Sequence, residues 1–302
     1  MLVSANLVPG LTIPDMRVWK VVPVLVLLVA ACSPQTESAA PSTTTPSVST
    51  STAPTTTLPL VAGCPEDGEF TEGGHVNTVD QPSSSDADTI GLISWAAEES
   101  CETFTVSFET SEGAPATTPP SVVVEYIDDV PVVRMALATE RTVITDQLVE
   151  TPMVDRLYVV NSIDGGMFID FHLASPAQAR ITVESSPARV LLDLQPGIVD
   201  YPNSVAASDF MVVVTPVDAS TETSPVSIEG YGRTFESNVL LIATAGDEVV
   251  AEDFTTATDS ESTWGEFATQ MTLPPGDVSL FVGDENQEQG GLEGVTVTLT
   301  VQ

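Results

Sequence analysis

Short runs in which apolar and polar residues alternate fill the chain from residue 63 onward, and proline, glycine and aspartate separate them. Alternation with a period of two, rich in β-branched residues, is typical of strands. In the segment MFIDFHLA, residues 167–174, the odd positions are apolar and the even positions include Asp170 and His172, which predicts one buried and one wetter face. No convincing amphipathic helix of ten residues interrupts these runs. The predicted fold class is therefore all-β.

The runs form two sets, which predict two domains. Eight runs fall within residues 63–200 and predict a first β domain: residues 89–95, 103–110, 121–127, 131–138, 155–162, 167–174, 180–184 and 189–194. Seven runs fall within residues 201–302: residues 209–217, 225–232, 238–245, 248–256, 264–273, 277–284 and 293–302. Seven short strands with regular turn signals are typical of an immunoglobulin-like β-sandwich. Residues 142–155 stay ambiguous.

The start of the chain has a different pattern. An unbroken apolar run from Val21 to Ala31 is too short to cross a bilayer core, which needs about 20 helical residues. Arg17 and Lys20 precede it, so residues 1–31 are predicted to be an export signal. Its end, VAAC, resembles a bacterial lipobox, which implies a lipid on Cys32. The alternative is an ordinary signal with a nearby chance cysteine.

Residues 32–62 are rich in serine, threonine and proline and hold almost no large apolar side chain. Such a segment cannot bury a core, so a disordered tether is expected. Together with the lipobox it predicts an exported protein, anchored by lipid to the outer face of the cytoplasmic membrane. The membrane is then a partner through the anchor.

Three cysteines are present, and the lipobox takes one of them. In an exported chain the remaining two, Cys64 and Cys101, are predicted to form a disulfide. A metal site is the poorer alternative, because two cysteines and two distant histidines lack a zinc-binding spacing.

The chain carries a formal net charge of −35. Its one lysine, Lys20, lies in the signal, so the exported chain has only six arginines as cations, five in the first domain and Arg233 in the second. Such a surface repels phosphate backbones and excludes nucleic-acid binding. The acidity itself fits either cation binding or a salt-adapted soluble surface.

Two segments resemble known families. Residues 155–196, which end in PARVLLDL at Pro187–Leu194, resemble the AMIN-like domain of actinobacterial secreted lipoproteins. The resemblance covers about residues 85–197 and implies a β-sandwich for the domain of residues 63–200 and attachment to peptidoglycan. The family commonly has Asp-Arg where this chain has Glu102-Thr103.

Residues 227–254, with the core GYGRTFESNV at Gly230–Val239, resemble the Gmad2-type immunoglobulin-like domain of bacterial spore-germination proteins. That resemblance covers about residues 205–302. It implies an interaction module without known chemistry, which also occurs in envelope lipoproteins.

Candidate chemistry is sparse. His75 and His172 are the two histidines, and nucleophile-elbow, P-loop and dinucleotide glycine motifs are absent from the sequence, so we expect no catalytic residue, metal or cofactor. The candidate ligand-binding residues are instead Trp95, Arg180 and Arg189. The competing interpretations are core packing for the tryptophan and pairing with neighbouring acids for the arginines.

The sequence therefore predicts a non-enzymatic envelope protein that binds peptidoglycan or wall glycan through its first domain. The alternative is a scaffold that docks an envelope protein partner through the immunoglobulin-like domain. A hydrolase is disfavoured, because few groups suited to metal or nucleophile chemistry are present.

Overall fold

All fifteen predicted runs form strands in the structure, a computed structural model that describes residues 64, 68–80, 84–98, 100–259, 261–285 and 290–302. Within these residues the helical structure is one 3₁₀ turn, Phe235–Ser237. The all-β prediction is confirmed. The proposed signal, Cys32 and the tether lie outside the described residues.

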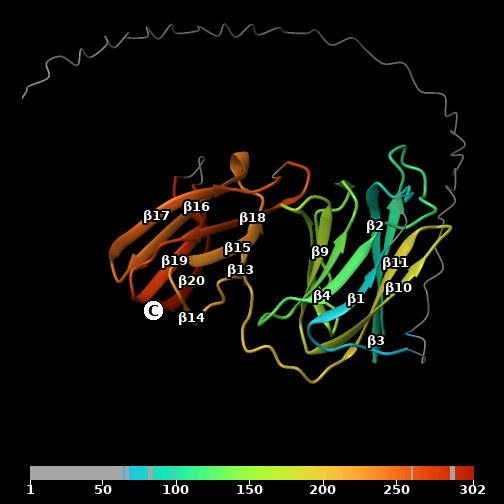
Figure 1. The fold of residues 1–302 in the computed structure, drawn as a ribbon, viewed down its shortest axis with the longest axis horizontal. Helices are drawn as coiled ribbons and strands as arrows, with labels where there is room; N and C mark the ends of the chain where they lie inside the picture. Colours follow the sequence, from blue (N-terminus) through green and yellow to red (C-terminus); the bar gives the residue numbers. More distant parts are fainter. Residues whose placement is uncertain (1–63, 65–67, 81–83, 99, 260, 286–289) are drawn as a thin grey trace, which may run out of the picture. The chain divides into compact units, whose positions relative to one another are not determined.

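The strands build three sheets (Figure 1). A five-stranded sheet runs in the order β10-β11-β3-β2-β6: β2 Thr89–Glu98, β3 Cys101–Glu109, β6 Arg141–Thr142, β10 Ala177–Glu184 and β11 Arg189–Pro196. It packs against one face of a larger sheet and encloses a core that includes Phe104, Phe108 and Phe171.

The larger sheet has ten strands in the order β1-β4-β5-β9-β8-β18-β15-β13-β12, with β7 paired to β8. We call the described residues up to 200 the first half and those from 201 the second half. The strands of the first half in this sheet are β1 His75–Val79, β4 Val122–Tyr126, β5 Val132–Leu137, β7 Asp146–Leu148, β8 Val154–Asn161 and β9 Met167–Leu173. Its second-half strands are β12 Ala206–Ala207, β13 Met211–Thr215, β15 Val226–Gly232 and β18 Trp264–Met271. A short parallel pairing joins the halves, with Trp264 opposite Val160 and Gly265 opposite Asn161.

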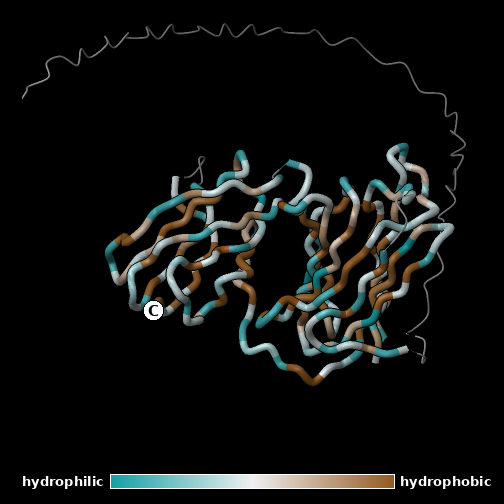
Figure 2. Tube along the Cα trace, in the orientation of Figure 1, coloured by the Kyte–Doolittle hydropathy of each residue, from teal (hydrophilic) through white to brown (hydrophobic). Residues whose placement is uncertain are grey.

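A second five-stranded sheet has the order β14-β20-β19-β16-β17: β14 Ser220–Glu222, β16 Asn238–Ala245, β17 Glu248–Thr256, β19 Gly276–Glu285 and β20 Leu292–Val301. It packs on β13, β15 and β18 around a second core that includes Phe267 and Leu280. Figure 2 shows apolar residues concentrated along the strands and polar residues at the turns. Each sandwich therefore has its own core.

A third apolar cluster lies where the two halves meet. Tyr158, Phe168, Tyr231 and Trp264 are its large members, and all are at most 2 % exposed. The Trp264 ring contacts Tyr158 edge-on at a centroid distance of 4.9 Å. Apolar burial of this kind is the main favourable term in folding, so each half helps to stabilise the other.

This contact overturns one prediction. Strand β9 was expected to have a wetter face at Asp170 and His172, but Asp170 is fully buried and His172 is partly buried. One face packs into the first core, and the other meets the second half. The hairpin signal before β9 is confirmed, since Gly165 and Gly166 both have positive φ angles of 90° and 76°.

Candidate functional site

A groove of about 440 Å³ lies along the sheet of β2, β3 and β11. The alternation of inward and outward residues along strand β3 explains how the sequence forms this groove. Phe104, Val106 and Phe108 point into the first core, so the intervening Thr105 and Ser107 point outward. Ser94 of β2 pairs in register with Thr105 and lines the same groove. The floor therefore consists of small hydroxyl-bearing side chains.

A β-bulge at Gly91 shapes one end of the groove. The register between β2 and β3 shifts between Ile90 and Leu92, which leaves Gly91 as the extra residue. A Cβ at Gly91 would lie 2.8 Å from Glu109 Cγ, so glycine is needed for the glutamate to lie there. Leu92, which is 42 % exposed, gives this end an apolar wall.

The floor hydroxyls differ in whether they have partners. Thr103 Oγ1 donates a hydrogen bond to the Asp193 carboxylate at 2.7 Å, so this hydroxyl already has a partner within the protein. Within the described residues, the hydroxyls of Ser94, Thr105 and Ser107 make no hydrogen bond to the protein. A hydroxyl both donates and accepts, so these three can bind either kind of polar group on a ligand. The alternation of residues along β3 is the sequence signal that identifies these hydroxyls as outward-facing.

Arg189 lines the other end of the groove. Its guanidinium pairs with Glu184 at 2.5 Å across the β10–β11 hairpin, and its side chain is 26 % exposed. Arg189 therefore lines the groove, and its guanidinium is paired with an acid of the chain.

Trp95 also lines the groove, and its ring packs inward. It pairs in register with Phe104 and stacks on that ring at a centroid distance of 6.2 Å. The ring belongs to the partly buried rim of the first core. It does not form the exposed aromatic platform that glycan binding by stacking requires.

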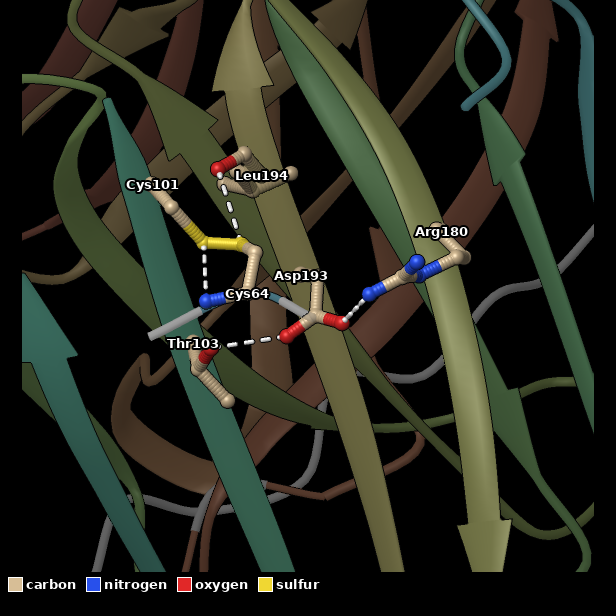
Figure 3. Close-up of a disulfide and its surroundings, with 6 residues drawn as sticks. All are labelled: Cys64, Cys101, Thr103, Arg180, Asp193 and Leu194. Atoms are coloured by element: carbon tan, nitrogen blue, oxygen red, sulfur yellow. Dashed lines mark hydrogen bonds and ion pairs between the residues drawn. A yellow bond between two sulfur atoms is a disulfide. The ribbon is translucent and has the colours of Figure 1, made fainter. Parts of the chain in front are cut away.

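Arg180 lies outside the groove lining. Its guanidinium pairs with Asp193 at 2.5 Å (Figure 3). The same group lies over the Phe70 ring at 4.6 Å. Asp193 is 4 % exposed at its side chain and accepts from both Arg180 and Thr103, which Figure 3 shows on either side of it. This arrangement ties three strands together, so its evident role is structural.

The other first-half arginines are engaged as well. Arg134 makes two bonds of 2.8 Å to Asp170, and Arg141 pairs with Asp88. Arg156 lies over the Tyr158 ring at 5.7 Å. An external carboxylate would have to compete with these contacts. The guanidinium groups of this half are therefore weaker candidates for ligand recognition than their number in the sequence suggests.

Cys64 and Cys101 form a disulfide, with their Cα atoms 5.8 Å apart (Figure 3). It ties the segment before β1 to the start of β3. Among the described residues, the cluster of three potential metal ligands is these two cysteines and Asp193. The two sulfur atoms are bonded to each other and Asp193 is paired with Arg180. These three groups therefore stabilise the fold and do not act as metal ligands.

Neither His75 nor His172 lines the groove. His172 Nε2 lies 2.6 Å from the Tyr231 hydroxyl at the contact between the two halves. Burial lowers the pKa of His172 to about 4, so the ring is neutral near pH 7. His75 begins β1 and is exposed, with Nε2 3.2 Å from the Thr78 hydroxyl.

Comparison with known families supports one of the two resemblances. Residues 210–291 match the family model of Gmad2, the immunoglobulin-like domain of bacterial spore germination. No significant similarity to a curated protein or to a solved structure was found. Within the described residues, no helix is long and apolar enough to cross a membrane.

Proposed function

We propose that the chain is a non-catalytic cell-envelope protein that binds peptidoglycan or wall glycan in the groove of β2, β3 and β11. The three unpartnered hydroxyls on the groove floor carry this proposal. Wall glycans are themselves rich in hydroxyl and amide groups, and a row of small hydroxyls can match them by donating and accepting. A groove of about 440 Å³ is of the size that ligand sites use, which is roughly 300–1,000 Å³.

The resemblance of residues 85–197 to the AMIN-like domain supports the same choice of ligand. The proposed lipid on Cys32 would hold the protein at the outer face of the cytoplasmic membrane, and residues 33–62 would extend from it toward the wall. The anchor and the groove then act together, one for the membrane and one for the polymer.

The groove lining also favours binding over catalysis. It contains no histidine or cysteine, and its titratable residues are Glu109 and Arg189. Hydrolysis of a glycan by paired carboxylates needs two acids facing one bond. One glutamate at the end of a hydroxyl-lined floor does not provide that pair.

The test is co-sedimentation of the secreted Cys32→Ser protein with purified peptidoglycan. The two halves are kept together, because each covers apolar side chains of the other. A triple variant, Ser94→Ala, Thr105→Val and Ser107→Ala, removes the unpartnered hydroxyls. Each hydrogen bond is worth about 1 kcal/mol, so binding should weaken by on the order of 100-fold.

Thr221→Val is the matched control, because it removes an exposed threonine hydroxyl from another sheet. It should bind like the parent protein. Equal sedimentation of the triple variant and the control would contradict the assignment of the groove. Failure of the parent itself to sediment would contradict wall binding.

A second candidate function rests on a separate observation. Phe254, on strand β17 of the Gmad2-type half, is 71 % exposed. A sheet edge that carries an exposed apolar side chain is a surface to which a strand of another chain can add. In this alternative the protein is an envelope adaptor that docks a partner protein through its immunoglobulin-like half.

A further inference from the structure

The outer face of the sheet formed by β17, β16 and β19 carries an apolar surface. Val239 and Leu241 of β16 point into the second core, so Leu240 and Ile242 point outward. In register, Leu240 lies opposite Phe254 of β17, and Ile242 lies opposite Phe281 of β19. We call Leu240, Ile242, Phe254 and Phe281 the outer apolar surface.

Glycines flatten this surface beside the aromatic rings. Gly283 lies opposite Leu240 in β19, and Gly294 of β20 lies opposite Gly283. A Cβ on Gly283 would lie 2.5 Å from the Phe281 ring, so the ring folds over the glycine. At the same end, the amide of Phe235, which is 60 % exposed, donates to Asp284 at 3.0 Å.

Strand β17 is also an edge. It ends the sheet order and has β16 as its paired neighbour, so within the described residues its other side has no ladder partner. It is nine residues long and contains no proline. An exposed edge strand with apolar residues is a template for pairing with another strand.

The charges around the edge restrict which strand can pair. Glu248, Glu252 and Asp253 of β17 are exposed, and Glu285 at the end of β19 is exposed as well. A second copy would place the same acids opposite one another, which is unfavourable. The predicted tether of this chain, residues 32–62, carries no arginine or lysine and would gain nothing from these charges.

We propose that β17 and the outer apolar surface dock a basic, apolar-alternating strand of a partner protein. The partner strand pairs with the free side of β17, its apolar residues cover Phe254 on the outer face, and its arginines or lysines lie on the other face, opposite Asp253. This inference rests on the adaptor function named above and is independent of the wall-binding groove.

The experiment measures binding of a labelled nine-residue peptide, in which arginine alternates with valine, to the secreted Cys32→Ser protein by fluorescence anisotropy. A peptide of the same composition with all its arginines at one end is the charge control. The alternating peptide should bind at least fivefold more tightly than this control. Equal binding of the two peptides would mean charge attraction only and would overturn the proposal, as would no binding of the alternating peptide.

Two variants test the surface. Phe254→Thr keeps a good strand former and should weaken binding by about tenfold, since it removes most of the exposed apolar contact. Leu148→Thr is its control, because Leu148 is 52 % exposed in the first half, and binding should not change. The double charge reversal Glu252→Lys with Asp253→Lys should also weaken binding by about tenfold.

The charge control is Glu112→Lys with Glu140→Lys, which changes the net charge equally at exposed positions of the first half. Equal losses in both double variants would overturn the assignment of β17. Concentration-dependent dimers that Phe254→Thr abolishes would assign the surface to a second copy and would also overturn it.

A photo-crosslinking residue at position 254 or 221 in cells separates this proposal from the adaptor function. Crosslinks to a protein from 254 and not from 221 agree with the peptide result. Crosslinks from 221 alone would overturn the β17 surface and leave the adaptor function standing. No crosslink from either position would count against both.

Discussion

His172 should make the stability of the protein depend on pH. The ring lies on β9 with Nε2 2.6 Å from the Tyr231 hydroxyl, and burial lowers its pKa to about 4. An unfolded histidine has a pKa of about 6.5. Between these two values the unfolded chain binds a proton that the folded chain does not, so stability is lost as the pH falls from about 6.5 to about 4.

The size of the loss follows from the two pKa values. At pH 5 the unfolded histidine is mostly protonated and the folded one mostly neutral, which lowers the free energy of unfolding by about 2 kcal/mol relative to pH 7.5. Nearby Asp170 and Asp155 favour the charged ring, but burial, with Arg134 and Arg156 acting in the same direction, outweighs these two acids. The neutral ring is therefore the form that the fold stabilises.

The assay is urea unfolding of the parent protein and of His172→Gln at pH 7.5 and pH 5.0. Glutamine keeps a hydrogen-bonding group for Tyr231 but does not titrate. The many carboxylates and the exposed His75 are common to both proteins, so they cancel in the difference. The stability advantage of the parent should shrink by about 2 kcal/mol at pH 5.0. An advantage that is the same at both pH values would refute the buried, neutral histidine.

Further predictions concern the anchor, the disulfide, one buried acid and the ionic strength. Cys32→Ser should release the protein from the membrane into the medium, and fractionation that finds it still with the membrane would reject the lipobox. Cys64 and Cys101 should resist thiol reagents until reduced, and their removal should cost about 4 kcal/mol by the loop-entropy estimate for a separation of 37 residues, measured by urea unfolding. Glu102→Ala should lower the free energy of unfolding by about 3 kcal/mol in the same assay. The reason is that this buried carboxylate accepts hydrogen bonds from the Met153 amide at 2.8 Å and the Thr151 hydroxyl at 2.6 Å. A loss below about 1 kcal/mol would argue against these bonds. Wall binding should strengthen as salt is raised moderately, because screening weakens the repulsion between a chain of net charge −35 and anionic wall polymers; a steady decrease would contradict this.

The long strands could be predicted because apolar and polar residues alternate along them. Phe104, Val106 and Phe108 alternate with small polar residues, and the structure buries the phenylalanines and the valine. Strands β6, β7, β12 and β14 have two or three residues each, which is too short for any periodicity to appear. They form because longer neighbours offer them hydrogen bonds.

The contact between the halves was not predictable from a single strand. Asp170 and His172 have the polarity of an exposed face, and only a partner 59 residues away, Tyr231, shows why His172 is partly buried. The interface satisfies these polar groups with Arg134 and Tyr231, so the cost of burying them is offset.

The candidate site was also predictable only in part, because its properties depend on contacts between different strands. Arg189 was expected to bind ligand and does line the groove, but the sequence did not reveal its pairing with Glu184. Trp95 was expected either in the core or at a binding surface, and the register with Phe104 turns its ring toward the core. The unpartnered hydroxyls depend on what lies above the sheet, which strand alternation does not determine.

Hydrogen exchange on the intact Cys32→Ser protein tests the proposed binding groove most directly. Amide protection is compared with and without soluble peptidoglycan fragments, and peptides from residues 91–109 and 187–191 report on the groove. We predict slower exchange in these two segments and no change in β17, Glu248–Thr256. Unchanged exchange in the groove at saturating fragment concentration, or protection confined to β17, would contradict wall binding at this site.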